Sequence, residues 1–301
     1  MFLSSRCLLT LVTSRDWQVE RRAVVDRDEY ACRSCGFEDA GDSRTALEIH
    51  PIDTAESGPG THAHESAFVT VCTDCSTTLR GDHAGIPETP TALFERVRET
   101  TQRQGGAISE VASFASLATS LPSALEADEI PAKSVDETNV ESADEGQTAA
   151  ENAASDPLEE YCRTRRDAIL ALDLADAHLE ALEAVDETAF DTDVRTSLQS
   201  VVESGHSLQS TLRTVVERAE TVPAGLERCA ACVGTVTDGS CSTCGLEARA
   251  TSEWEDPDGT LAFERLFAAI NSELQAASGT TKTLTEQTTT LAEALSGEEA
   301  S

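Results

Sequence analysis

The chain has 301 residues, with 55 acidic against 22 basic side chains, a formal net charge of −33 and a pI of about 4.3. It contains no apolar run of about 18 residues, which excludes a membrane-spanning helix, and its overall charge gives no argument for nucleic-acid binding. Acidic surfaces stay hydrated in strong brine, where salt screens the repulsion between carboxylates. The composition therefore predicts a halophilic protein rather than a disordered one, and we expect it in the cytoplasm because no clear signal peptide opens the chain.

Positive charge is concentrated in the first third of the sequence. From Arg15 to Arg103 there are ten arginines, whereas the linker that follows residue 127 has almost no basic residue. If the protein binds nucleic acid, we expect the N-terminal part to do so.

Eight of the ten cysteines form four CxxC pairs. In a cytosolic protein such pairs indicate zinc rather than disulfides, because each CxxC turn directs two thiolates at one point and two turns complete a tetrahedron. The alternative is a redox CxxC motif. We expect two structural zinc sites, with these ligands: Cys32, Cys35, Cys72, Cys75, Cys229, Cys232, Cys241 and Cys244. Of the two remaining cysteines, Cys162 falls on an apolar helical position and is expected in a core.

The first half of the chain predicts a small mixed domain over residues 14–105. Residues 14–26 form an amphipathic pattern capped by Ser14, and the alternation at 47–52 and 68–72 predicts two strands. A helix is expected after Cys75, another over 91–104, and a weaker, Pro122-containing helix over 106–127. Residues 128–156 have almost no large apolar side chain, which predicts a disordered acidic linker.

The second half predicts a helical bundle over residues 157–296. One apolar pattern starts after Pro157, and heptad-like seams run from Val194 to Ala219 and from Phe267 to Leu295. The zinc knuckle at 226–247 interrupts the helices. We therefore expect three antiparallel helices, a module that serves as a spacer or assembly unit and that could pair with a second copy or another protein. The predicted fold class is α+β: a small zinc-bound domain followed by a mostly α-helical bundle or coiled coil that carries a second zinc knuckle.

Three stretches of the first domain resemble the HNH endonuclease family, in the branch with a zinc-clamped ββα-metal core and most similar to haloarchaeal members. They are W17 with RRAVVDRDEYACRSCG, then LEIHPI, then FVTVCTDC. The resemblance covers residues 15–85. It implies cleavage of DNA by one divalent ion, Mg²⁺ or Mn²⁺, with a histidine as general base.

The residues that the resemblance assigns to catalysis are mostly replaced. His50 falls on the metal-ligand position, but Pro51 falls on the general base, and proline cannot exchange a proton. Ala67 stands where the family has an asparagine that orients the base, and Ser76 stands where it has a second metal ligand. Arg80 occupies a position where some members carry a further histidine.

Three rearrangements could still restore activity. A one-residue slip would make His50 the base, but Ile49 would then occupy the ligand position and an alkyl group binds no metal. His62 or His64 could reach into the site from the loop between the strands, and His83 could replace the missing ligand. An exposed loop position is the simpler interpretation for all three histidines.

The sequence therefore predicts an HNH relative with impaired catalysis, holding two structural Zn²⁺ ions and acting as a nucleic-acid-binding module, with DNA as the expected partner, or as an interaction module. A working endonuclease with relocated ligands is the first alternative. The second is a structural adaptor that acts through its helical bundle.

Overall fold

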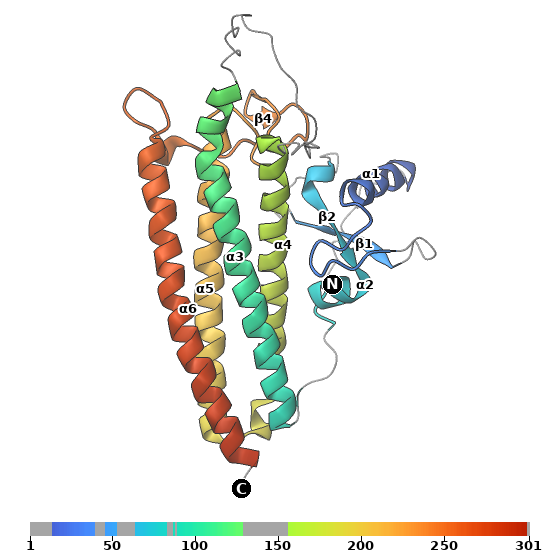
Figure 1. Cartoon of the computed structure of the whole chain (residues 1–301), viewed down its shortest axis with the longest axis vertical. Helices are drawn as coiled ribbons and strands as arrows, with labels where there is room; N and C mark the ends of the chain where they lie inside the picture. Colours follow the sequence, from blue (N-terminus) through green and yellow to red (C-terminus); the bar gives the residue numbers. More distant parts are fainter. Residues whose placement is uncertain are drawn as a thin grey trace, which may run out of the picture.

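The structure is a computed structural model that describes residues 14–39, 46–52, 64–82, 87, 89–128 and 156–299. A small N-terminal module, residues 14–82, lies against one side of a long four-helix bundle (Figure 1). The expected linker at 128–156 lies almost entirely outside the described residues. Among the described helices, none combines the length and the apolar character needed to cross a lipid bilayer.

The N-terminal module is built from two helices and a two-stranded sheet. Helix α1 (Ser14–Arg27) precedes the first CxxC turn, and strands β1 (Leu47–Pro51) and β2 (Phe68–Cys72) pair antiparallel, with Leu47 opposite Cys72 and Pro51 opposite Phe68. A short 3-10 turn, η1 (Glu65–Ala67), leads into β2, and helix α2 (Thr73–Leu79) follows it directly. The expected helix and both strands are thus confirmed in this part of the chain.

The bundle contains four helices: α3 (Pro90–Asp128), α4 (Pro157–Glu183), α5 (Thr192–Ala224) and α6 (Phe263–Glu299). They run alternately up and down, and α3 and α5 meet across the diagonal, where Gln209 Nε2 donates a 2.8 Å hydrogen bond to Gln104 Oε1 (Figure 1). The heptad positions expected in α5 are buried. In α6 the seam mostly alternates between buried and half-buried residues, and within the bundle this helix packs mainly on α5 and also on α3.

The expectation of two separate helices over residues 91–104 and 106–127 is wrong. Helix α3 runs without a break through Gly105 and Gly106 and through Pro122, and it joins the bundle rather than the N-terminal module. Its buried side chains keep a regular spacing of four and three residues: Leu93, Val97, Thr100, Gln104, Ala107, Val111, Phe114, Ala118 and Leu121. This continuous buried seam stabilises the helix across residues that are poor helix formers.

The segment between α5 and α6 forms a compact cap at one end of the bundle (Figure 1). It holds the second set of cysteines, of which Cys241 lies on a strand and the others lie in turns. Its elements are strands β3 (Val236–Thr237) and β4 (Ser240–Cys241) and a 3-10 turn, η3 (Ser252–Trp254). A further 3-10 turn, η2 (Glu187–Ala189), joins α4 to α5.

Helix α4 is the element shared by both parts of the molecule. It contacts α3 and α5 within the bundle and α2 and β2 of the N-terminal module. Residues around its whole circumference are therefore buried, including Leu170, Leu172 and Ala175. The apolar residues of the N-terminal module and of the bundle form one continuous core cluster.

Candidate metal centres and the contact between β1, α2 and α4

The first four cysteines meet in one place. The Sγ atoms of Cys32, Cys35, Cys72 and Cys75 lie within 4.8 Å of one another, and Cys35 Sγ lies 3.7 Å from Cys72 Sγ. Four thiolates at about 2.3 Å from a tetrahedral zinc ion stand about 3.8 Å apart. The geometry and the all-thiolate donor set therefore fit a structural Zn²⁺ ion.

Two different backbone conformations present these thiols. Around Cys32 the chain forms a tight knuckle, in which Cys32 N–H donates to Phe37 O at 2.8 Å and Gly36 N–H donates to Cys32 O at 2.9 Å. Gly36 has φ +72°, a left-handed conformation that glycine adopts at little cost. On the other side Cys72 is the N-cap residue of α2, so Cys75 lies in the first turn of that helix.

The second four cysteines form a site from two knuckles. Cys229 N–H donates to Gly234 O and Cys241 N–H donates to Leu246 O, both at 2.8 Å, as Cys32 does in the first site. The Sγ atoms lie within 4.8 Å of one another, with Cys232 and Cys241 only 3.4 Å apart. Both expected cysteine sets are thus assembled by the fold, and both fit zinc.

The thiols of each site have unequal proton affinities. A hydrogen bond from Cys75 lowers the pKa of Cys32 to about 4, and the same bond raises the pKa of Cys75. Hydrogen bonds from Cys232 and Cys244 lower the pKa of Cys229 to about 2 and raise those of the two donors. One thiolate in each site is therefore available at neutral pH to capture a metal ion, and further protons leave as the other thiols bind.

His50, the one expected catalytic residue that remains, faces helix α4. Its Nε2 atom lies 3.3 Å from Asp173 Oδ2, with both side chains largely covered. Asp173 also accepts a hydrogen bond from Arg213 of α5 at 3.1 Å. The imidazole is thus part of an ion-pair network that joins the N-terminal module to the bundle.

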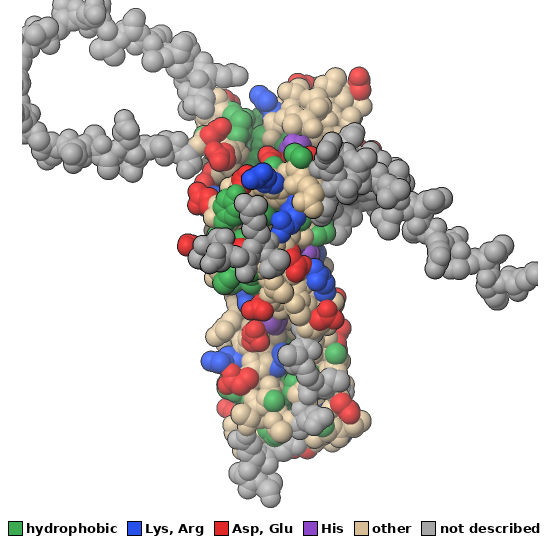
Figure 2. All heavy atoms as spheres, turned by 90° about the vertical axis from the view of Figure 1, so that its right-hand side faces the viewer, with side chains coloured by type: hydrophobic (Ala, Val, Ile, Leu, Met, Phe, Trp, Pro, Cys, Tyr) green, Lys and Arg blue, Asp and Glu red, His purple; other side chains and the backbone are tan. Residues whose placement is uncertain are grey.

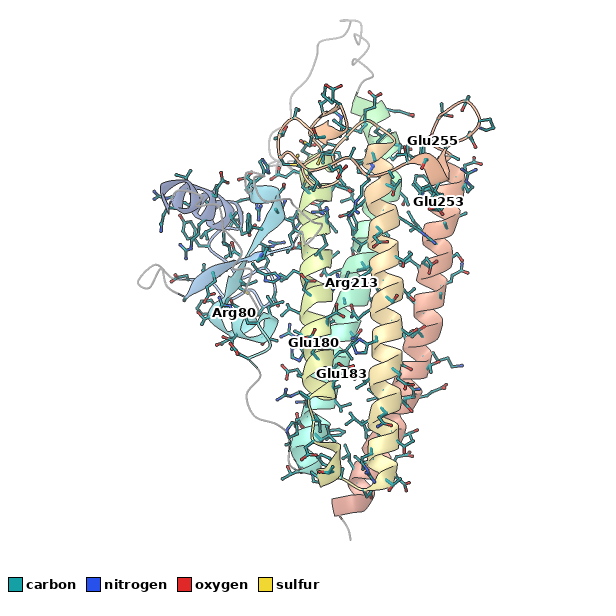
Figure 3. All side chains as sticks on the ribbon, turned by 180° about the vertical axis from the view of Figure 1, so that it is seen from behind. Arg80, Glu180, Glu183, Arg213, Glu253 and Glu255 are labelled. Atoms are coloured by element: carbon teal, nitrogen blue, oxygen red, sulfur yellow. The ribbon has the colours of Figure 1, made fainter. Side chains whose placement is uncertain are left out.

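The neighbouring positions on this face are occupied by a second polar network. Glu48 lies on the same face of β1 as His50, because side chains two apart on a strand share a face. Ser76 Oγ donates to Glu48 Oε2 at 2.8 Å, and Arg80 forms an ion pair with the same oxygen. Figure 3 shows Arg80 at the end of α2, and Glu180 and Glu183 along α4, the bundle helix that α2 contacts. Ser76 and Arg80, at the two positions where the HNH resemblance led us to expect histidines, therefore contact a carboxylate.

The remaining expected site residues lie away from this network. Pro51 is exposed at the end of β1, and Ala67 accepts a backbone hydrogen bond from Ile52 at 3.0 Å. The Nδ1 atom of His64 accepts from the backbone N–H of Ser66 at 3.1 Å, so this histidine is tied to the start of β2. His62 and His83 lie outside the described residues.

The sequence analysis missed Asp173, the partner of His50. The two residues are 123 positions apart, and Asp173 is one of many acidic side chains on α4. Nothing in the local sequence distinguishes it from its neighbours, so only the docking of the N-terminal module on the bundle identifies it.

No family model matches the chain, and no match was found among the curated proteins or the solved structures. The HNH resemblance therefore rests on the residues quoted for it.

Proposed function

We propose that this protein is a non-catalytic relative of the HNH endonucleases, in which a zinc-stabilised ββα module is fixed to a helical bundle and serves as an interaction module. The observation that carries the proposal is the 3.3 Å contact between His50 Nε2 and Asp173 Oδ2. His50 contacts a carboxylate of the bundle, and serine fills the neighbouring metal-ligand position. The site therefore lacks the set of ligands that a catalytic divalent ion requires.

The covering of this face by α4 supports the same conclusion. A phosphodiester bond must approach the metal and the general base within hydrogen-bonding distance. Here α2 and β2 pack on α4, and His50 and Glu48 are engaged by side chains of the protein itself. Pro51, at the general-base position, supplies neither a proton nor a lone pair.

A cleavage assay tests this proposal. The zinc-loaded full chain is incubated with supercoiled plasmid and Mg²⁺ or Mn²⁺ over a range of KCl concentrations, with His50→Ala as the matched variant. We expect no nicking by either protein. Metal-dependent nicking by the wild type that disappears in His50→Ala would establish the endonuclease alternative and overturn the proposal.

Nucleic-acid binding without cleavage is the second candidate, and one feature of the surface favours it. Arg22 is exposed on α1, beside the exposed side chains Val19 and Tyr30, and these residues border a cavity of about 820 Å³. Figure 2 shows basic side chains interspersed with apolar and acidic ones over the N-terminal module. Arginine and aromatic side chains together form sites for single-stranded nucleic acid.

Retention of labelled single-stranded and double-stranded DNA by the full chain tests this candidate. Binding that weakens in Arg22→Gln but not in Arg98→Gln, an exposed arginine on α3, supports it. Equal retention by both variants, or none at any salt concentration, leaves protein–protein interaction as the function.

A further inference from the structure

A cavity of about 500 Å³ lies where the N-terminal module, the start of α4 and the second cysteine loop meet. Arg27 from α1 and His64 from the start of β2 line one side, and Cys162 and Arg166 of α4 line another. The loop from Ala231 to Gly234 closes it on the third side. This cavity is separate from the contact between β1, α2 and α4.

Arg166 is the unusual residue of this cavity. Its relative exposure is only 8%, yet among the described residues it makes no hydrogen bond and no ion pair. Burial, together with the nearby guanidinium of Arg27, lowers the pKa of Arg166 to about 10. No guanidinium nitrogen of Arg166 is both fully buried and without a partner, so its donors reach the solvent of the cavity and are free for an acceptor that enters it.

Two carboxylates near Arg166, those of Asp28 and Asp167, are already paired with other arginines. Arg27 forms two hydrogen bonds to Asp28, at 2.9 and 3.0 Å, and Asp28 Oδ2 also accepts from the backbone of Thr70. Asp167, the next residue after Arg166, is held by Arg33 at 2.5 and 3.1 Å. Asp28 and Asp167 are thus paired with Arg27 and Arg33, and they attract the guanidinium of Arg166 without forming an ion pair with it.

His64 supplies a second donor. Because the backbone N–H of Ser66 donates to Nδ1, the neutral imidazole carries its proton on Nε2, which makes no hydrogen bond within the described residues. The acidic residues that line the cavity are Glu65 and, exposed at the start of α4, Asp156 and Glu159. Asp156 is occupied in capping α4 through the backbone of Leu158, and salt screens the exposed charges.

We propose that this cavity is an oxyanion site that takes a phosphate group, with the guanidinium of Arg166 as its main ligand and the Nε2–H of His64 as a second donor. A guanidinium matches two phosphate oxygens with two parallel N–H groups, and such charge-assisted hydrogen bonds are the strongest that a side chain forms. The proposal does not depend on the function proposed above.

Calorimetric titration of inorganic phosphate into the zinc-loaded full chain, with KCl holding the ionic strength constant, tests the site. Arg166→Gln is compared with Arg163→Gln, which removes the same charge from an exposed position on the same helix. We expect saturable binding that weakens at least tenfold in Arg166→Gln and changes less than twofold in Arg163→Gln. Absence of saturable binding by the wild type, or equal weakening in both variants, would overturn the proposal.

Thermal unfolding distinguishes a binding role from a structural one. In phosphate-free buffer, Arg166→Gln should unfold at the same temperature as the wild type or at a higher one, since it removes a covered charge without a partner. Phosphate should raise the unfolding temperature of the wild type and of Arg166→Lys, but not that of Arg166→Gln. A lower unfolding temperature with loss of zinc in Arg166→Gln would show that the residue is structural and would refute the site.

Fluorescence anisotropy with a labelled single-stranded oligonucleotide identifies the source of the phosphate group. An oligonucleotide that binds, is displaced by inorganic phosphate and is lost in Arg166→Gln indicates a nucleic-acid phosphate. Binding of inorganic phosphate without binding of the oligonucleotide indicates a free anion or a small phosphorylated ligand. Either result keeps the oxyanion site, and neither changes the outcome of the cleavage assay.

Discussion

His50 at the end of β1 and Asp173 on α4 lie 3.3 Å apart, Nε2 to Oδ2, and join the two parts of the molecule. The residue expected to bind a catalytic metal ion therefore acts as a contact between the N-terminal module and the bundle. Each side chain of the pair is about a fifth exposed, 21% and 23%, so its coupling free energy should lie in the range of partly covered ion pairs.

A double-mutant cycle over His50→Ala and Asp173→Ala measures this coupling. We expect a coupling free energy of about 0.5–1 kcal/mol in urea unfolding, with no loss of zinc, because neither residue touches the cysteine sites. A matched cycle over Arg98 and Glu95, an exposed pair on α3, should give a smaller value. Zero coupling between His50 and Asp173 would contradict the contact.

Metal analysis should give two zinc ions per chain, one for each cysteine set. Cys32→Ser and Cys229→Ser should each lose one ion, since three thiolates and a hydroxyl bind zinc far more weakly than four thiolates. A Cys162→Ser control should keep both ions, because burial raises the pKa of that thiol to about 11 and it belongs to neither set. Loss of both ions in a single-site variant would show that the two sites are coupled.

Zinc binding should weaken as the pH falls. The ligand thiolates must lose their protons to bind, and the pKa of Cys32, lowered to about 4, and that of Cys75, raised, show that the metal-free site still carries protons at neutral pH. In the metal-free protein the stabilisation from the Cys32 thiolate is fully present only above its ordinary pKa of 9.0 and is lost as the pH falls through about 4. Competition with a colorimetric chelator measures the zinc affinity between pH 8 and pH 5. A zinc affinity that stays constant over this range would refute the prediction.

Glu220 on α5 is the centre of a buried charge cluster. Its carboxylate accepts a 2.6 Å hydrogen bond from Arg165 Nε, both side chains are 1% exposed, and Arg249 of the second cysteine loop pairs with the other oxygen. Glu220→Gln leaves a buried guanidinium without a counter-charge, so we expect a loss of about 3–5 kcal/mol in the free energy of unfolding.

Glu160→Gln is the control for that variant, since it breaks the exposed pair with Arg163 one helix away. It should cost about 0.2–1 kcal/mol. Urea unfolding measures the free energy of unfolding of both variants. Equal losses in this free energy would mean that burial of the Glu220 cluster does not increase its contribution to stability.

Gly205 of α5 lies directly against the side chain of Leu179 of α4. A Cβ atom at this position would lie 2.5 Å from Leu179 Cδ2, so Gly205→Ala should destabilise the bundle by about 1–3 kcal/mol through overpacking. Gly279 lies on the exposed side of α6 with no atom within 4 Å of its Cβ position. Gly279→Ala should therefore stabilise the protein by up to about 1 kcal/mol, as measured by thermal unfolding. A stabilising Gly205→Ala would contradict the observed packing.

Short-range signals in the sequence correctly predicted the strands, the first helix and the two cysteine sets. The CxxC spacing is local, and the heptad positions of α5 are strongly apolar, so both are visible without knowledge of the fold. The seam of α3 has the same spacing, but Thr100 and Gln104 are polar and Gly105, Gly106 and Pro122 are poor helix formers. Their effect is offset by burial against α4 and α5, which no local pattern reveals.

The partners of the candidate site residues could not be predicted for a related reason. His50 and Asp173, and likewise Arg33 and Asp167, are brought together only when the N-terminal module docks on α4. On an acidic chain many carboxylates are equivalent in sequence, and charge alone cannot select among them. The unpaired Arg166 is also visible only after the neighbouring carboxylates have been assigned to other arginines.

Because α4 is enclosed by the N-terminal module on one side and by α3 and α5 on the other, neither part can come apart without exposing it. The chain should therefore lose its structure in one transition instead of melting as two independent units, and the backbone amides in the middle of α4 should be among the slowest to exchange with deuterium. Loss of zinc from either cysteine set should therefore lower the unfolding temperature of the whole chain rather than that of one part alone.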